Sequence, residues 1–308
     1  MNAMIRVVVL TAAMAGANVT AAAAPSTQPA GVESARAAAE KGDTTAMVEL
    51  GDTYQLGAGV PQDFQQAMIW FRKAADAGDS GGMNNIGLLY SNGQGVAQDY
   101  QQAMTWYRKS ADAGDGAGMD NVGFLYQHGL GVSKDDAAAF TWYRKGADAG
   151  DETAMNQVGY FYLHGVSVTK DYSQAMIWFR KAANAGNVDA MCNLGAVYQQ
   201  GSGVDADYAQ AMLWYRKAAD LGSADAMYNI GFLYTYGLGV PKDFVLAMTW
   251  FRKAADAGEP IAMYNIGYML ETGMGVDKDD TQARVWFRKG ADAGSAQAQK
   301  WLADHPAN

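Results

Sequence analysis

The sequence is poor in the residues that most catalytic and metal sites need, with one cysteine and three histidines in 308 residues. A single cysteine excludes an intramolecular disulfide framework and a metal cluster held by cysteines. Three histidines leave little material for a zinc site or for histidine-based catalysis. Lys and Arg number 23 against 32 Asp and Glu, a net charge of −9. Because an acidic chain repels phosphate backbones, we expect no nucleic-acid partner.

The N-terminus has the pattern of a secretory signal peptide. Arg6 precedes an apolar run, and small residues follow up to Ala24. We expect residues 1–23 to be the signal, cleaved after one of residues 21–23, and residues 24–32 to be a linker. A membrane anchor is the weaker alternative, because the most apolar part is too short to span a bilayer. The expected location is the periplasm or the outside of the cell, with no membrane insertion after cleavage.

Tryptophan recurs every 36 residues along the rest of the chain, and the sequence around each tryptophan is nearly the same. The seven are Trp70, Trp106, Trp142, Trp178, Trp214, Trp250 and Trp286. This register defines seven units without insertion: 44–79, 80–115, 116–151, 152–187, 188–223, 224–259 and 260–295. Such periods are typical of stacked helical repeats. A half-unit at 33–43 and a helix with tail at 296–308 are predicted to cap the ends.

Each unit reads as two helices joined by a glycine loop. In residues 80–115, the apolar positions 4, 7, 8 and 11 are spaced as one face of a first helix. Gly93 and Gly95 follow in a Gly-x-Gly-Val loop. Asp99 is predicted to be the N-cap of the second helix, with Gln102 three residues later completing a capping box. Gly114 is predicted to end it.

A glycine recurs inside every first helix, at a cost of about 1 kcal/mol each relative to alanine. These residues are Gly51, Gly87, Gly123, Gly159, Gly195, Gly231 and Gly267. The repetition predicts a packing gain, namely the close approach of a helix carrying Trp and Phe or Tyr. A pair of such short helices cannot bury both faces alone, so the units must stack. Ser34 in place of Trp, and Gln299 and Lys300 at the other end, make the end faces polar.

The repeated motif reads A-M-x-N-[IVL]-G-x-L-Y-x-x-G-x-G-V-x-x-D-[YF]-x-Q-A-M-x-W-[YF]-R-K-A-A-D-A-G. This motif resembles the Sel-one-like (Sel1-like) repeat, a relative of the tetratricopeptide repeat. The resemblance covers most of the chain and implies an all-α, right-handed α/α solenoid. It also implies an adaptor whose concave face, lined by first helices, holds another protein. Exported bacterial members include envelope regulators, partners of cell-wall enzymes, host-interaction factors and immunity proteins against periplasmic effectors. A cysteine-rich branch is linked to penicillin binding, but its paired cysteines are missing here.

Several candidate chemical sites have simpler structural interpretations. The Gly-x-Gly-Val loop lies between helices, whereas a nucleotide fingerprint requires a strand before it. His128 and His164 share position 13 of adjacent units, which suggests a two-ligand metal site, a pH-sensitive contact, or two exposed residues that duplicated together. Cys192 has no base at the neighbouring equivalent positions, so we expect an inert residue, or an exposed thiol that pairs with another chain.

Charged residues also recur with the repeat. The pattern is represented by Arg72, Lys73 and Asp76. It is either a charged stripe that binds a partner or a solvent-exposed helix face with ion pairs along the helix, and we favour the exposed face. The carboxylate pairs Asp135/Asp136 and Asp279/Asp280 each contain an N-cap, so we expect no acid–base catalysis. No cofactor, metal site or turnover is predicted.

The positions that vary between units are the candidates for function. Positions 2, 5, 9, 12 and 13 of a tetratricopeptide-like first helix face the groove, and positions 5 and 9 become aromatic in the last two units. Rigid aromatic rings are good binding anchors. The predicted partner-binding residues are Tyr228, Phe232, Tyr236, Tyr264, Tyr268, Phe124 and Tyr160. The alternative is that some of these rings pack between units.

The sequence therefore predicts an exported, non-enzymatic solenoid that binds another protein or a peptide segment, as an envelope regulator or an immunity protein. A cell-wall or β-lactam-acting enzyme is the first alternative, and a host-interaction factor is the second. A structural spacer would fit if the groove proved polar and featureless.

Overall fold

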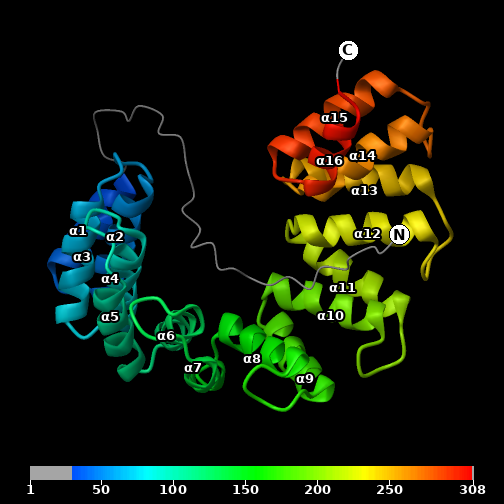
Figure 1. Cartoon of the computed structure of the whole chain (residues 1–308). Helices are drawn as coiled ribbons and strands as arrows, with labels where there is room; N and C mark the ends of the chain where they lie inside the picture. The colour runs from blue at the N-terminus through cyan, green and yellow to red at the C-terminus, as the bar shows by residue number, and fades with distance from the viewer. Residues whose placement is uncertain (1–29, 307–308) are drawn as a thin grey trace. The chain divides into compact units, whose positions relative to one another are not determined.

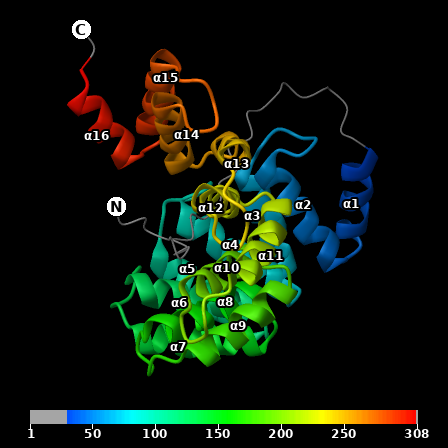
Figure 2. The ribbon, with the colours of Figure 1, turned by 90° about the vertical axis from the view of Figure 1, so that its right-hand side faces the viewer.

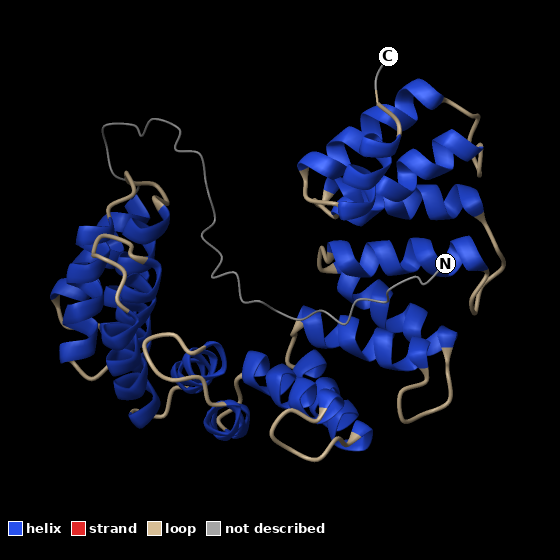
Figure 3. Cartoon of the chain, viewed as in Figure 1, coloured by secondary structure: helices blue, strands red, loops and turns tan. Residues whose placement is uncertain are grey.

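The structure, a computed structural model, describes residues 30–306, and these residues form helices and connecting loops (Figure 1). No strand occurs in this part of the chain (Figure 3). The predicted signal peptide lies outside the described residues. Two compact units divide the described chain, one up to Trp178 and the other from Phe179, so the boundary falls inside helix α9 (Tyr172–Asn184).

The helices alternate between the two kinds predicted from the repeat. The first helices are α2 (Thr44–Leu56), α4 (Ser80–Asn92), α6 (Gly116–His128), α8 (Glu152–His164), α10 (Val188–Gln200), α12 (Ala224–Tyr236) and α14 (Pro260–Thr272). The second helices are α3 (Phe64–Asp76), α5 (Tyr100–Asp112), α7 (Asp136–Asp148), α9, α11 (Tyr208–Asp220), α13 (Phe244–Asp256) and α15 (Asp280–Asp292). Consecutive helices pack against each other from α1 to α8 and from α10 to α16, which confirms the all-α solenoid of helix pairs.

Single helices stand at the two ends. α1 (Ala30–Glu40) packs on α2, and α16 (Ala296–Asp304) packs on α14 and α15, as both views of the C-terminal end show (Figures 1 and 2). α1 begins inside the predicted linker, because the side chain of Val32 is buried in the core around α2 and α3. Gln299 and Lys300 are exposed, as the predicted polar end requires.

The predicted aspartate N-caps are present, but the capping box is not complete. Asp99 accepts hydrogen bonds from the backbone N–H groups of Gln101 and Gln102 at 2.9 and 3.0 Å. Its own N–H donates to the carbonyl of Tyr90 in the preceding first helix at 2.9 Å. The backbone N–H of Asp99 is therefore already bonded and does not donate to the side chain of Gln102. The predicted bond from this N–H to Gln102, which would complete the capping box, is wrong. The Asp99–Tyr90 bond instead fixes the turn between the two helices.

The glycine inside the first helix accommodates an aromatic ring of its own repeat. A Cβ on Gly123 of α6 would lie 2.8 Å from ring carbons of Tyr143 in α7, which is too close for real atoms. This contact confirms the predicted close approach of the two helices. The ring that meets the glycine is the Phe or Tyr of the second helix, not its Trp, and Tyr143 is fully buried. Trp106 is only half-buried, and the ammonium group of Lys109 lies 3.9 Å from its ring centroid.

The buried face of the first helix differs slightly from the predicted one. Position 10 is buried in most units, as Leu89, Leu125 and Leu233 show, whereas the predicted position 4 is half-buried at Met83. Positions 3, 7 and 10 therefore form the centre of the face, and position 3 packs on the preceding second helix: a Cβ on Gly82 of α4 would lie 2.7 Å from the Cβ of Ala74 in α3.

Loop glycines let each 36-residue repeat approach the preceding repeat. Gly131 has a φ of 69°, a left-handed conformation, and a Cβ there would lie 2.8 Å from Tyr100 at the start of α5. Ser167 replaces the equivalent glycine in the next unit and still adopts a φ of 54°. The second helix that precedes Ser167's repeat is α7, and it starts with Asp136 where α5 starts with Tyr100. The larger loop residue thus occurs where the opposing aromatic residue is missing.

Candidate functional site

The predicted binding residues follow one stripe on the first helices. Tyr228, Phe232 and Tyr236 are four residues apart on α12, and Tyr264 and Tyr268 repeat the spacing on α14. These five residues lie in the unit from Phe179 onward. Phe124 of α6 and Tyr160 of α8 lie in the other unit. The seven residues thus divide between two units, and each group is a separate candidate surface.

Two of the five rings in the C-terminal group are partly core. Tyr228 lies 5.7 Å, centroid to centroid, from the buried ring of Phe251, and Tyr264 lies 5.5 Å from that of Phe287. Burial raises the pKa of the Tyr264 hydroxyl, with smaller contributions from the nearby Tyr268 and Glu271. Position 5 therefore packs on its own helix pair, and its ring supports the stripe from below.

The remaining rings reach solvent. Tyr236 is 46% exposed and Tyr268 is 36% exposed, while Phe232 is half-buried. The rings of Phe232 and Tyr236 are in contact with centroids 4.5 Å apart. Tyrosine rings have few rotatable bonds, so they lose little side-chain entropy when a ligand covers them. Tyr236 and Tyr268 are therefore the best placed of the predicted residues to meet a partner.

Phe124 and Tyr160 each contact the histidine one turn further along the helix. Centroid distances are 4.2 Å from Phe124 to His128 and 4.3 Å from Tyr160 to His164. His128 Nδ1 lies 3.0 Å from the carbonyl oxygen of Phe124. Burial, with help from Lys170, lowers the pKa of His164. Both histidines thus cover a neighbouring ring.

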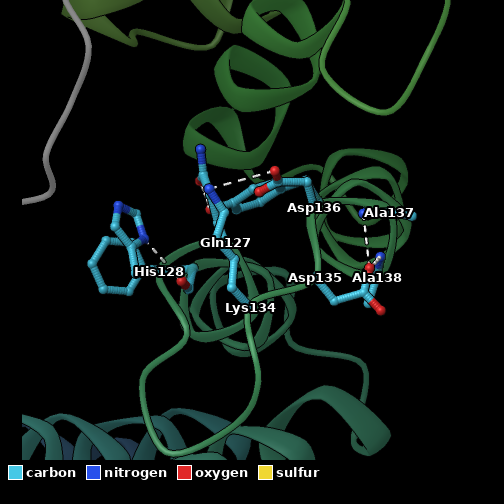
Figure 4. A network of polar contacts seen from close by, with 9 residues as sticks. Gln127, His128, Lys134, Asp135, Asp136, Ala137 and Ala138 are labelled. Atoms are coloured by element: carbon cyan, nitrogen blue, oxygen red, sulfur yellow. Dashed lines mark hydrogen bonds and ion pairs between the residues drawn. The ribbon is translucent and has the colours of Figure 1, made fainter.

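Among the described residues, the two histidines do not belong to a larger cluster of metal-ligating side chains. His128 lies on the opposite side of Gln127 from Asp135 and Asp136 (Figure 4). Within residues 30–306, no group of three or more His, Cys, Asp or Glu side chains could hold a metal ion.

The paired carboxylates have structural partners. Asp135 accepts hydrogen bonds from the N–H groups of Ala137 and Ala138 at 3.0 and 2.9 Å, as an N-cap (Figure 4). Asp136 forms an ion pair with Lys134 at 3.5 Å, and Asp280 pairs with Lys278 at 3.3 Å. A carboxyl that caps a helix beside one that pairs with lysine gives no acid–base couple for catalysis.

Cys192 is a buried residue at position 5 of α10. Its Sγ lies 3.2 Å from the hydroxyl oxygen of Ser223, and burial raises the pKa of the thiol to about 12. The expectation of an inert residue agrees with this environment. The alternative of an exposed thiol that pairs with another chain is wrong, because Cys192 is buried in the helix packing, with 3% of its surface exposed.

The Arg-Lys pattern has a role that the sequence did not reveal. Arg108 of α5 donates to the hydroxyl of Tyr126 in the next first helix at 2.6 Å, and the same bond joins Arg216 to Tyr234 at 3.1 Å. In at least six of the repeats the lysine beside the arginine lies over the tryptophan, as Lys217 does over Trp214 at 4.2 Å. The basic residues thus bind aromatic rings between and within units, and the predicted helical ion pair occurs at Arg144 and Asp148.

Side-chain amides also link neighbouring first helices. Asn85 of α4 donates to Asp52 of α2 at 3.1 Å, and Asn121 of α6 donates to Asn84 of α4 at 2.9 Å. Sequence reasoning missed these bonds, although asparagine at position 6 of most units was a visible signal. They join the first helices α2, α4 and α6 to one another.

Comparison with known proteins identifies the repeat. The family model described as Sel1 repeat matches residues 44–79, 80–115, 116–151, 153–187, 188–223, 224–259 and 260–295. A search of curated proteins gave no match. No helix of the described residues is long and apolar enough to cross a membrane.

Two solved structures are similar over most of the chain. A protective antigen of uropathogenic Escherichia coli strains, with an SLR fold, is 37% identical with a TM-score of 0.70, covering 90% of this chain and 60% of that one. A Sel1 repeat protein from Oxalobacter formigenes is 33% identical with a TM-score of 0.69, covering 89% of this chain and 80% of that one. This chain is thus shorter than the antigen that it resembles.

Proposed function

The chain belongs to the Sel1 repeat family, and on that premise we propose that it is an exported, non-enzymatic adaptor that binds another protein on the stripe of its first helices. The observation that carries the proposal is the exposure of Tyr236 and Tyr268 on the stripe, above rings that are part of the core. An exposed group of aromatic side chains on a rigid helical surface is typical of a protein-binding site.

The absence of turnover is part of the proposal. The cysteine is buried, the paired carboxylates cap helices or pair with lysine, and the two histidines of α6 and α8 cover aromatic rings. A nucleophile with an adjacent base is therefore not assembled among the described residues. The alternative, an enzyme acting on the cell wall or on β-lactams, would be established by reproducible hydrolysis that a single substitution abolishes.

Affinity capture from an envelope fraction tests the binding site. The purified protein serves as bait, and the variant Tyr236→Ala with Tyr268→Ala removes the exposed rings without reaching Phe251 or Phe287. Loss of an aromatic anchor costs about 2 kcal/mol, or roughly thirtyfold in affinity.

The control variant is Leu213→Ala with Val285→Ala, which removes apolar side chains of similar exposure (45% and 44%) from the second helices. The captured partner should be lost from the aromatic variant and kept by the control. Equal retention by both variants would place the binding surface elsewhere.

Export is a separate part of the proposal and rests on the sequence of residues 1–23. Mass spectrometry of the mature N-terminus in envelope fractions is expected to find a start near residues 22–24. An intact Met1 on cytoplasmic protein would refute it. The role as envelope regulator or as immunity protein is then decided by neighbouring genes, a sensor kinase for the former and an effector for the latter.

A second candidate function is that of a host-interaction factor. The observation in its favour is that the similar protein of uropathogenic Escherichia coli, 37% identical, is a protective antigen. This candidate predicts that the protein is found outside the cell or at its surface, so labelling of intact cells with a specific antibody distinguishes it from a periplasmic adaptor.

A further inference from the structure

The two kinds of helix differ completely in basic residues. None of the seven first helices, from α2 to α14, contains a lysine or an arginine. Every second helix contains an adjacent Arg-Lys pair. In α11, for example, Arg216 is bonded to the hydroxyl of Tyr234 and Lys217 lies over the ring of Trp214. The net charge of −9 does not by itself account for the absence of lysine and arginine from the first helices. Acidic residues occur on both kinds of helix, whereas of the two kinds only the second helices contain lysine or arginine.

Acidic side chains stand on the same stripe as the aromatic rings. In the unit from Phe179 onward, Asp189 of α10 and Asp225 of α12 share position 2 of their repeats. Burial and the nearby carboxylate of Asp225 raise the pKa of Asp189, so the two carboxyls are electrostatic neighbours. Glu271 stands on α14, where its Oε1 accepts a hydrogen bond from Trp301 at 3.2 Å.

Helical spacing aligns these acids with the rings. Asp225, Tyr228, Phe232 and Tyr236 are separated by three, four and four residues, which places them along one face of α12. The carboxylate lies at the N-terminal end of that face, and the exposed ring of Tyr236 lies at the other end. A ligand lying along α12 would therefore meet a negative charge and then an aromatic surface.

We infer that the face formed by α10, α12 and α14 binds a lysine- or arginine-containing segment of the partner protein. The inference rests on the proposed function, since it names the chemistry of the partner at the same surface. Carboxylates attract the cation, and the faces of Tyr236 and Tyr268 receive it by cation–π contact. The chain uses the same contact internally, with Lys253 4.2 Å from the ring centroid of Trp250. Because the first helices have no basic side chain, an acidic segment lying along them would find no counter-charge on these helices.

The test measures binding of two labelled peptides by fluorescence anisotropy. One is a 15-residue peptide of alternating lysine and alanine, and its counterpart has glutamate in place of lysine. The lysine peptide should bind in low salt and be released in 1 M salt, where charges are screened within about 3 Å. The glutamate peptide should not bind.

A matched pair of variants separates the site from general attraction to an acidic protein. Asp189→Asn with Asp225→Asn neutralises the proposed face. Asp220→Asn with Asp256→Asn changes the net charge equally at exposed positions of the second helices α11 and α13. Affinity for the lysine peptide should fall at least tenfold in the first variant and stay within twofold in the second. Equal losses in both would overturn the inference.

The exposed rings give a second variant in case the aspartate variant does not fold. Tyr236→Leu with Tyr268→Leu keeps apolar area but removes the aromatic faces, so the lysine peptide should bind at least fivefold more weakly. Unchanged binding would overturn the cation–π part of the inference.

The same variants separate this inference from the proposed function. If the captured envelope partner is lost from Tyr236→Ala with Tyr268→Ala but kept by Asp189→Asn with Asp225→Asn in any salt, the surface binds a protein and the cationic segment is wrong. If neither variant loses the partner, both proposals fail.

Discussion

Gly231 of α12 lies directly against the ring of Phe251 in α13: a Cβ at position 231 would be 2.8 Å from two ring carbons and 3.3 Å from the carbonyl oxygen of Ala247. The contact joins the two helices of one repeat, and the equivalent pair recurs at Gly123 and Tyr143. These repeats thus depend on a missing side chain at one position and a large ring at another.

The first prediction concerns this contact. Gly231→Ala should lower the free energy of unfolding by about 1–3 kcal/mol, because overpacking of the core exceeds the gain of about 1 kcal/mol in helix propensity. Gly31→Ala is the control, since Gly31 lies in α1 with nothing within 4 Å of the added Cβ. Urea unfolding monitored by circular dichroism measures both. A stabilised Gly231→Ala variant would contradict the packing argument.

The second prediction concerns the buried hydroxyl of Tyr215, which donates to Gln199 Oε1 at 2.8 Å. Tyr215→Phe should cost about 1–3 kcal/mol, because it leaves the buried acceptor unsatisfied. Adding Gln199→Leu should recover part of the loss, since Phe179 and Leu163 occupy the same repeat positions in the fourth unit. A double-mutant cycle from urea melts checks this, and simple additivity of the two losses would count against the pairing.

The third prediction concerns Asp120 of α6, whose buried Oδ1 has no hydrogen-bond partner among the described residues. Burial, together with Asp151 and Glu152, raises the pKa of Asp120 well above its usual value. The folded state therefore binds this proton more tightly than the unfolded chain, so the ionised carboxylate destabilises the fold increasingly as the pH rises above about 4.

Asp120→Asn should accordingly raise the stability by about 1 kcal/mol at pH 7, and the gain should disappear near pH 4. Asparagine already occupies position 5 in the flanking units, as Asn84 and Asn156. Thermal melts of both proteins at the two pH values measure the effect, with the exposed Asp112→Asn as control. A gain that is equal at both pH values would show that charge burial is not its cause.

The fourth prediction concerns Cys192, whose pKa is raised to about 12 by burial. The thiolate is the reactive form, so the native protein should react with a thiol reagent at pH 8 far more slowly than the unfolded chain does. The rate should remain low up to pH 10 and become fast in denaturant. Rapid stoichiometric labelling of the native protein would mean that α10 opens readily.

Particular residues show how much the sequence could predict. The 36-residue spacing of Trp70 and its equivalents, together with Asp99 and Gly93, predicted the helix pairs, their caps and their loops, because these depend on neighbours within one unit. The prediction that Gln102 completes a capping box was wrong, because the N–H of Asp99 is bonded to Tyr90 in another helix. The sequence did not distinguish the Trp from the Phe or Tyr as the ring that meets the glycine, and Trp106 remains half-exposed with Lys109 over its ring.

The sequence by itself determined the repeat, its register and the stripe on which Tyr228, Phe232, Tyr236, Tyr264 and Tyr268 stand, because helical periodicity is a local property of the chain. Tertiary structure alone decided which rings of that stripe support the core and which reach solvent. The reason is that the exposure of Tyr236 and the packing of Tyr228 on Phe251 depend on a second helix, whose distance is set by the missing side chain at Gly231.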